Sequence, residues 1–290
     1  MTKGVFIRVI GSINLDIVAS GAALPRAGET VTGATLAYHP GGKGANQALA
    51  ARRLGANVAL FGCVGMDPAA DQALSLLRAA DIDLKGVSLS RSLPTGVALI
   101  GVSNSGENQI IVAPGANNAV KPQDLGDLDT QQFDATICQL EIPISTVEAI
   151  AKSVMGFFAI NLAPAQAVSR AILERADLII VNETEAAFYG DELLDLPGLL
   201  VVTLGAAGAS MYQGEQQTIW AHSPKVIPVD TTGAGDTFVS ALVVALVEGQ
   251  SRQDAMNFAC AAGAAATLMA GAQPSLPDRD VIRALLEATL

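Results

Sequence analysis

The chain has 290 residues, half of them hydrophobic and 16% charged, and its formal net charge is −11 at pH 7. This much apolar material can form one large buried core, which excludes an intrinsically disordered protein. The acidic balance excludes a nucleic-acid partner, which would need a basic face. Anionic ligands are therefore expected to bind locally, at backbone amides, helix ends or a metal ion.

Cysteine and histidine are scarce. Cys63, Cys138 and Cys260 lie singly in apolar segments, which indicates free thiols in the reducing cytoplasm. With two histidines in the chain, neither a histidine-rich zinc site nor a histidine-dependent triad is expected. The first residues lack the pattern of a signal peptide, and residues 255–272 are too rich in alanine and glycine for a membrane span. We therefore expect a cytoplasmic protein without a membrane partner.

Short apolar runs alternate with helical patterns along most of the chain. Apolar strands separated by helices indicate a mostly parallel sheet with helices on both faces, that is, a three-layer α/β/α domain. The predicted strands are 6–10, 58–63, 135–140, 157–161, 178–181, 199–204 and 226–229, and the predicted helices are 44–54, 69–80, 145–155, 167–174, 183–189, 237–248 and one that opens at Ser251.

Two turn-rich segments interrupt this alternation. Residues 15–40 and 95–113 read as hairpins, and neither is followed by a crossover helix. We predict that they form a small antiparallel sheet, a lid inserted into a single domain that spans residues 1–290.

The first predicted strand is followed by Gly11-Ser-Ile-Asn-Leu-Asp16. In extended backbone Asn14 and Asp16 lie on the same face, where an amide and a carboxylate can bind vicinal hydroxyl groups of a sugar. Taken alone, the segment also fits a turn with two polar caps.

The next motif, Pro40-Gly-Gly-Lys-Gly-Ala-Asn-Gln47, opens a helix. Lys43 lies where the helix dipole disfavours a cation, which suggests contact with an anion or a hydroxyl group. The motif is not a P-loop, because Gly44 stands where that loop has Ser or Thr.

The most specific motif is Asp230-Thr-Thr-Gly-Ala-Gly-Asp236, just before a predicted helix. Unpaired amides at a helix start form an anion hole, which can stabilise the charge on a transferring phosphoryl group. Asp236 would lie beside it and accept a proton from a hydroxyl group. A shorter glycine turn would be read as an ordinary helix cap. The dinucleotide fingerprint is missing because residue 238 is Phe.

These motifs together resemble the ribokinase (PfkB) family of carbohydrate kinases, over nearly the whole chain. The resemblance implies that Asp236 is the catalytic base and that the amides of Gly233, Ala234 and Gly235 form the anion hole. The segments at 11–16, 40–48 and 139–141 resemble the family's sugar-binding elements. The sugar-binding residues implied in this way are Asn14, Asp16, Gly42, Lys43, Asn46 and Glu141, beside Asp236.

The second half of the chain matches the family's nucleotide-binding elements. The implied nucleotide-binding residues are Asn182, Thr203, Gly205, Gly208, Gly235 and Cys260, the last where relatives usually have Asn or His. Glu185 is implied in binding Mg²⁺ through water, and a monovalent cation, K⁺, would bind at Asp230, Thr232, Ala266, Met269, Gly271 and Ser275. A further departure is Asn161-Leu-Ala-Pro164, where the family more often has Asn-Pro-Ala-Pro.

The resemblance implies transfer of a phosphoryl group from ATP to the 5-hydroxyl of a sugar, with D-ribose as the expected substrate and a homodimer formed through the lid. Another kinase of the family, acting on deoxyribose, a ketohexose or a nucleoside, is the nearest alternative. A non-catalytic sugar-binding regulator is a further alternative that the intact Asp236 disfavours. A nicotinamide dehydrogenase is disfavoured by the missing fingerprint.

Overall fold

The computed structural model describes residues 4–125 and 133–288, and its core is a nine-stranded sheet. The strand order is β13-β12-β11-β10-β9-β8-β1-β4-β5. All neighbouring strands from β5 to β11 pair in parallel, and only the pairs β11–β12 and β12–β13 are antiparallel. The strands are β1 (Phe6–Ile10), β4 (Asn57–Gly65), β5 (Asp83–Ser90), β8 (Ala135–Cys138), β9 (Phe157–Asn161), β10 (Leu178–Asn182), β11 (Leu199–Thr203), β12 (Ala209–Gln213) and β13 (Gln216–Ala221).

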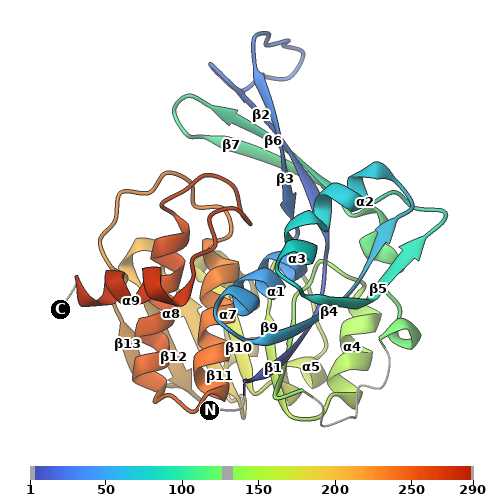
Figure 1. Ribbon diagram of the computed structural model, residues 1–290. Helices are drawn as coiled ribbons and strands as arrows, with labels where there is room; N and C mark the ends of the chain where they lie inside the picture. Colours follow the sequence, from blue (N-terminus) through green and yellow to red (C-terminus); the bar gives the residue numbers. More distant parts are fainter. Residues whose placement is uncertain (1–3, 126–132, 289–290) are drawn as a thin grey trace.

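Helices cover both faces of this sheet, which confirms the predicted three layers (Figure 1). Side chains alternate along each strand: Ile7 and Val9 of β1 belong to one hydrophobic cluster and Ile10 to the other. The first cluster is covered by α1 (Lys43–Arg53), α2 (Pro68–Ala73), α3 (Ser75–Ala79), α7 (Ala234–Val247), α8 (Arg252–Ala266) and α9 (Arg279–Glu287), and the second by α4 (Ile144–Ser153), α5 (Arg170–Arg175) and α6 (Glu183–Tyr189).

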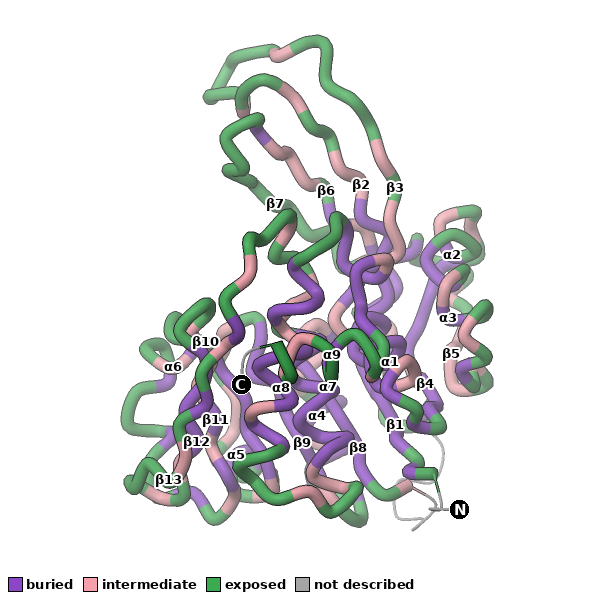
Figure 2. The backbone as a smooth tube through the Cα atoms, turned by 60° about the vertical axis from the view of Figure 1, so that its left-hand side comes forward, coloured by how far each residue is buried: buried purple, intermediate pink, exposed green. Residues whose placement is uncertain are grey.

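A separate four-stranded sheet, the lid sheet, projects from the carboxyl edge of the main sheet (Figure 1). Its order is β3-β2-β6-β7, with β2 (Asn14–Gly21), β3 (Thr35–Gly41), β6 (Gly96–Ser103) and β7 (Asn108–Ala113). The prediction of an antiparallel sheet is wrong in one respect, since β2 and β6 pair in parallel. Each of them follows a strand of the parallel main sheet, β1 and β5, so both leave the body in the same direction. Figure 2 shows that the lid sheet mixes exposed, half-buried and buried residues, and β7 is exposed along its whole length.

Other local predictions also need correction. Residues 226–229 form no strand; the backbone N–H groups of Val229 and Asp230 instead donate to the carbonyl of Thr267. The predicted helix 69–80 is interrupted at Leu74. The prediction omitted β5, β12, β13 and α9. In the part of the chain that the structure describes, no helix has the length and apolarity to cross a membrane.

Four short 3₁₀ segments complete the described structure: η1 (Gly115–Ala119), η2 (Pro122–Asp124), η3 (Gly190–Leu193) and η4 (Gly205–Ala207). The first of them follows the last lid strand and carries the buried Asn117. The fourth follows β11 and begins at Gly205, which has a positive φ of 54°.

Candidate active site

Asp236 lies in the first turn of α7 and is 8% exposed. Both of its carboxylate oxygens accept hydrogen bonds from α1: Oδ2 from Asn46 Nδ2 over 2.8 Å and Oδ1 from Gln47 Nε2 over 3.0 Å. Burial raises the pKa of Asp236, although Lys43 and these two hydrogen bonds oppose the rise, while Glu141 adds to it. The residue is thus a buried carboxylate in fixed orientation.

Two glycines before Asp236 shape the start of α7. Gly233 has a φ of 80°, a left-handed conformation that glycine adopts without strain. A Cβ atom on Gly235 would meet no atom within 4 Å. The amides of the first helical turn, which have no helical partner, therefore border open space, as an anion hole requires.

The predicted sugar-binding residues gather where the chain leaves β1 and β8. These neighbouring strands lead into segments that run to opposite sides of the sheet, and ligands of α/β folds bind at such a switch point. The Ser12 hydroxyl after β1 donates to Glu141 Oε2 after β8, and the backbone N–H of Lys43 donates to the same oxygen over 3.2 Å. Glu141 thus joins three separate segments.

Asn14 and Asp16 begin the first lid strand, and both are buried. Gly41 packs so closely on Asp16 that a Cβ atom would lie 2.2 Å from its Oδ2. A Cβ atom on Gly42 would lie 2.7 Å from the backbone nitrogen of Asn14. Burial, with Glu141 and Asp236 nearby, raises the pKa of Asp16 to about 7.

Lys43 is the cation among these carboxylates. Burial alone would lower the pKa of its ammonium group, but Asp236, Glu141 and Glu185 raise it above the usual value. Lys43 therefore carries its positive charge at neutral pH, although the helix dipole disfavours it there.

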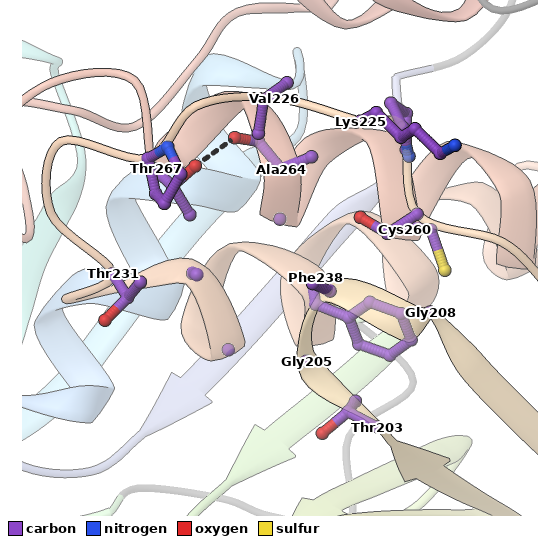
Figure 3. Close-up of a pocket in the computed structure, with 17 residues that line it drawn as sticks. Thr203, Gly205, Gly208, Lys225, Val226, Thr231, Phe238, Cys260, Ala264 and Thr267 are labelled. Atoms are coloured by element: carbon purple, nitrogen blue, oxygen red, sulfur yellow. Dashed lines mark hydrogen bonds between the residues drawn. The ribbon is translucent and has the colours of Figure 1, made fainter.

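A cavity of about 360 Å³ lies between α7, α8 and η4. Figure 3 shows Cys260, Ala264 and Thr267 above Phe238 and Thr203. Burial raises the pKa of the Cys260 thiol to about 12, so the thiol is a neutral lining group. The lining comprises Thr203, Gly205, Ala206, Gly208, Ser223, Pro224, Lys225, Val226, Pro228, Thr231, Ala234, Gly235, Phe238, Cys260, Gly263, Ala264 and Thr267.

A second cavity, of about 220 Å³, shares Thr203, Thr231 and Gly235 with the first and extends to Lys43 and Asp236. The two cavities thus adjoin at these three residues, and the smaller one leads from the largely apolar slot to the buried carboxylate. Asn182 and Glu185 also line the second cavity.

Asn182 and Glu185 form a capping box at the start of α6, the structural role that an acidic helix start suggests. Asn182 Oδ1 accepts from the N–H of Glu185, and Glu185 Oε2 accepts from the N–H of Asn182, each over 2.8 Å. Burial raises the pKa of Glu185, against the effects of Asn182 and Lys43.

The predicted cation loop is closed by Asp230. Its Oδ1 accepts from the N–H and the hydroxyl of Thr232, and its Oδ2 accepts from the N–H of Gly271 over 2.8 Å. Burial opposes these hydrogen bonds, yet they hold the pKa of Asp230 below its usual value, with help from His39. Ser275 continues the loop, because its N–H donates to the carbonyl of Gly271.

The other two predicted cation residues differ in exposure: Ala266 is buried and Met269 is 58% exposed. Among residues 4–125 and 133–288, no three His, Cys, Asp or Glu side chains are arranged to hold a metal ion. Apart from Asp230, the predicted cation residues offer only hydroxyl and backbone carbonyl oxygens.

Sequence reasoning missed several polar residues of the site. Gln47 was part of a recognised motif, but its bond to Asp236 could not be read from the sequence. Gln139 Nε2 donates to Gln47 Oε1, and Asn161 Oδ1 accepts from Gln47 Nε2 over 3.4 Å. Asn117 Nδ2 donates to Asn14 Oδ1 over 2.7 Å. The partners of these pairs lie between 92 and 189 residues apart in the chain, so no local pattern joins them.

A buried carboxylate beside helix-start amides, next to a slot that can hold a nucleotide, defines a phosphotransferase that acts on a hydroxyl group. Comparison with known proteins agrees. The family described as pfkB family carbohydrate kinase matches residues 6–279. The chain belongs to this family, and it is an ATP-dependent sugar kinase.

Individual relatives match over nearly their whole length. Ribokinase of Haemophilus influenzae is 37% identical over 300 residues, covering 96% of this chain and 97% of that protein. Ribokinase of Bacillus subtilis is 37% identical, with coverage of 96% and 98%. The crystal structure of ribokinase from Thermotoga maritima has a TM-score of 0.89 at 33% identity, covering 98% of this chain and 99% of that one. Arabidopsis thaliana ribokinase complexed with ribose and ATP has a TM-score of 0.84 at 30% identity, with coverage of 98% and 99%.

Proposed function

We propose that the protein is a ribokinase, which transfers the γ-phosphoryl group of ATP to the 5-hydroxyl of D-ribose. The observation that carries the proposal is the position of Asp236, at the meeting point of the polar sugar-side residues and the path that leads to the nucleotide slot. The names of the full-length relatives and the neighbour complexed with ribose and ATP support this choice of substrates.

The sugar would bind between Asn14, Asp16 and Glu141 on one side and Asn46 and Lys43 on the other. Asn46 supplies a specific reason to place the sugar there. Its Oδ1 atom is buried and has no hydrogen-bond partner within the described residues. An unpaired buried acceptor costs about 1–3 kcal/mol, and a sugar hydroxyl would satisfy it while Nδ2 stays on Asp236.

Asp236 would accept the proton of the 5-hydroxyl as that oxygen attacks the γ-phosphorus. Asn46 and Gln47 fix the direction of the carboxylate before the substrate arrives, so little reorganisation is needed. The proton passes from the hydroxyl oxygen to Asp236 while the bond between the γ-phosphorus and the β,γ-bridging oxygen breaks.

The amides of Gly233, Ala234 and Gly235 would receive the equatorial oxygens of the phosphoryl group. Lys43, charged and facing the same cavity, would add a positive charge to that site. Thr203, Gly205, Gly208 and Cys260 line the larger slot, where the base and ribose of ATP would lie. Cys260 would offer the base an uncharged, weakly polar surface.

Mg²⁺ bound with ATP would offset the negative charge of the phosphates. Glu185 faces the smaller cavity, and its capping bond uses Oε2, so Oε1 can bind a metal-coordinated water. Asp230 and Thr232, with carbonyl groups of Ala266, Met269, Gly271 and Ser275, would hold K⁺ at the loop beside the anion hole. Oxygen-rich carbonyl sites suit such a hard cation.

The lid sheet would cover the bound sugar and exclude water, which would otherwise hydrolyse ATP. Its edges also suggest a partner. Leu36, Tyr38, Leu99, Ile110 and Ile111 are between 47% and 68% exposed, more apolar surface than a lone lid should offer water. We infer a homodimer that buries this surface, located in the cytoplasm, where the free thiols stay reduced.

The test is ADP release with a panel of ribose, deoxyribose, ketohexoses and nucleosides, each with and without K⁺. The highest kcat/KM is expected for ribose. A higher kcat/KM for another sugar would refute ribose as the substrate but not the kinase activity. No ADP release with any sugar would support a sugar-binding protein instead.

Asp236→Asn tests the catalytic base. We expect kcat to fall by about 10²- to 10⁴-fold, with ribose binding still measurable by calorimetry. The asparagine keeps the size and loses the basic oxygen. A kcat near that of the unaltered protein would refute the role of Asp236.

A further inference from the structure

Asn117, outside every motif discussed above, is 1% exposed, and all hydrogen bonds of its side chain go to the segment that leads into the lid. It belongs to η1, the turn that follows the last lid strand. Its Oδ1 accepts from the backbone N–H of Ile13 over 2.9 Å, and its Nδ2 donates to the carbonyl of Ile13 over 3.3 Å and to Asn14 Oδ1 over 2.7 Å.

These bonds fix which way each amide faces. A backbone N–H can only donate, so the atom of Asn117 that faces the N–H of Ile13 must be the oxygen. The amino group of Asn117 then faces Asn14, and the atom of Asn14 that meets it must be Oδ1. Asn14 is thereby left with its Nδ2 group free of bonds to the described residues.

The backbone around the pair is built to admit it. Gly96 opens lid strand β6 opposite Asn14 in the register of β2 and β6. A Cβ atom at Gly96 would lie 2.2 Å from Asn14 Oδ1 and 2.4 Å from Asn117 Nδ2. Any other residue there would displace one of the two amides.

We propose that Asn117 is a positioning residue that orients the Asn14 amide so that its amino group donates to a hydroxyl oxygen of the sugar. The inference rests on the proposed function, because it needs Asn14 to contact the sugar. Asp16, on the same face of β2, can only accept when ionised. The Asn14 amino group and the Asp16 carboxylate then select two adjacent hydroxyl groups: one accepts a hydrogen bond from Asn14, and the other donates one to Asp16.

Asn117→Asp is nearly isosteric and reverses the polarity of the contact. The new carboxylate oxygen cannot donate to Asn14 Oδ1, so the Asn14 amide turns and presents its oxygen to the sugar. We expect the KM for ribose to rise about tenfold, since the sugar oxygen loses its buried hydrogen-bond donor. The KM for ATP should stay unchanged. The neighbouring Asn118 is exposed in the same turn, so Asn118→Asp adds the same charge and should leave both values unchanged.

A double-mutant cycle separates orientation from general stability. The dissociation constant of ribose is measured by calorimetry for Asn14→Ala, Asn117→Ala and the double variant, and ADP binding serves to show that each is folded. If Asn117 acts through Asn14, the double variant binds ribose as weakly as Asn14→Ala alone. If the two substitutions multiply in their effect on the ribose dissociation constant, the inference is wrong. It is also wrong if Asn117→Ala binds ribose normally while Asn14→Ala binds it more weakly. If Asn14→Ala itself binds ribose normally, the sugar role of Asn14 in the proposed function fails and the inference falls with it.

Discussion

The carboxylate of Asp236 is poised between two opposing effects. Removal from water favours its protonated form, and the donors on Asn46 and Gln47 favour its ionised form. Gln47 is itself held by Gln139, whose Oε1 is buried without a partner in the described chain. An unpaired polar atom at this depth is a cost that apolar residues would avoid, which supports a link between these amides and the proposed role of Asp236 as base.

Gln47→Met removes one donor from Asp236 and keeps the volume of the side chain. Because that hydrogen bond lowers the pKa of Asp236, its loss raises the pKa further, and the fall of kcat/KM on acidification should begin at higher pH. The measurement is the pH profile of kcat/KM for ribose.

Ser240→Ala is the matched control for that experiment. The buried Ser240 hydroxyl bonds the backbone carbonyls of Gln47 and Asp236, over 2.9 Å and 3.0 Å, and does not touch the carboxylate. The Ser240→Ala variant should have a lower Tm but the same pH profile of kcat/KM as the unaltered protein. Equal profiles for Gln47→Met and the unaltered protein would show that the hydrogen bond does not tune the base.

Asp16 predicts a coupling between ribose binding and protons. With its pKa raised to about 7, Asp16 is about half protonated at neutral pH. Sugar hydroxyls donate to the ionised form, so binding lowers the pKa and releases protons near pH 7. Well below that pH, ribose affinity should fall about tenfold per unit as the proton competes.

Calorimetry in buffers of different ionisation enthalpy counts the released protons. Asp16→Asn should bind ribose more weakly and with no such buffer dependence. Equal ribose affinity at pH 6 and pH 8 in the unaltered protein would contradict the assignment of Asp16.

At the scale of elements, the start of α7 makes different demands on its two glycines. A side chain on Gly233 would combine a φ of 80° with a contact 3.0 Å from the carbonyl of Ala272. A side chain on Gly235 meets no neighbour and would enter both cavities.

Gly235→Val should therefore fold with a Tm close to that of the unaltered protein but lose nearly all activity, with a raised KM for ATP. Gly233→Val should instead lower Tm, because the strained backbone conformation costs about 1–3 kcal/mol of folding free energy. Thermal unfolding and ADP release on both variants check the contrast. An active Gly235→Val variant would mean that phosphate does not approach this turn.

The sequence was informative where one short segment carried both the pattern and the chemistry. The strand and helix pattern predicted the three layers, and Gly233 to Asp236 predicted a helix-start site. The pattern failed where a distant element decided the outcome. Val226 resembles a strand residue, but this segment pairs with the end of α8 and lines a cavity. Asn117 had no local signal, because its partners lie about a hundred residues earlier in the chain.

For the whole molecule, the lid sheet exposes large apolar side chains, which is unusual for a chain that stays monomeric. β7 is exposed along its full length and forms one edge of the sheet. An unpaired edge with apolar side chains tends to pair with another chain.

Ile111→Asp should therefore convert the proposed dimer to a monomer, as measured by sedimentation velocity. Ile111 is 68% exposed, so the substitution should lower the free energy of unfolding by no more than about 0.5 kcal/mol. Gln109→Asp, on the same face of β7, adds the same charge without removing apolar surface and should remain dimeric. A monomer before any substitution would refute the dimer directly.

β2 begins with Asn14 and Asp16 in the closed interior and ends among the exposed residues of the lid sheet. One strand thus connects the proposed sugar contacts to the sheet that carries the surface proposed for the second subunit. Thermodynamic reciprocity then applies: whatever factor subunit association contributes to ribose affinity, ribose must contribute to subunit association. The dissociation constant of the dimer, measured with and without saturating ribose, would give the size of that coupling without any measurement of turnover.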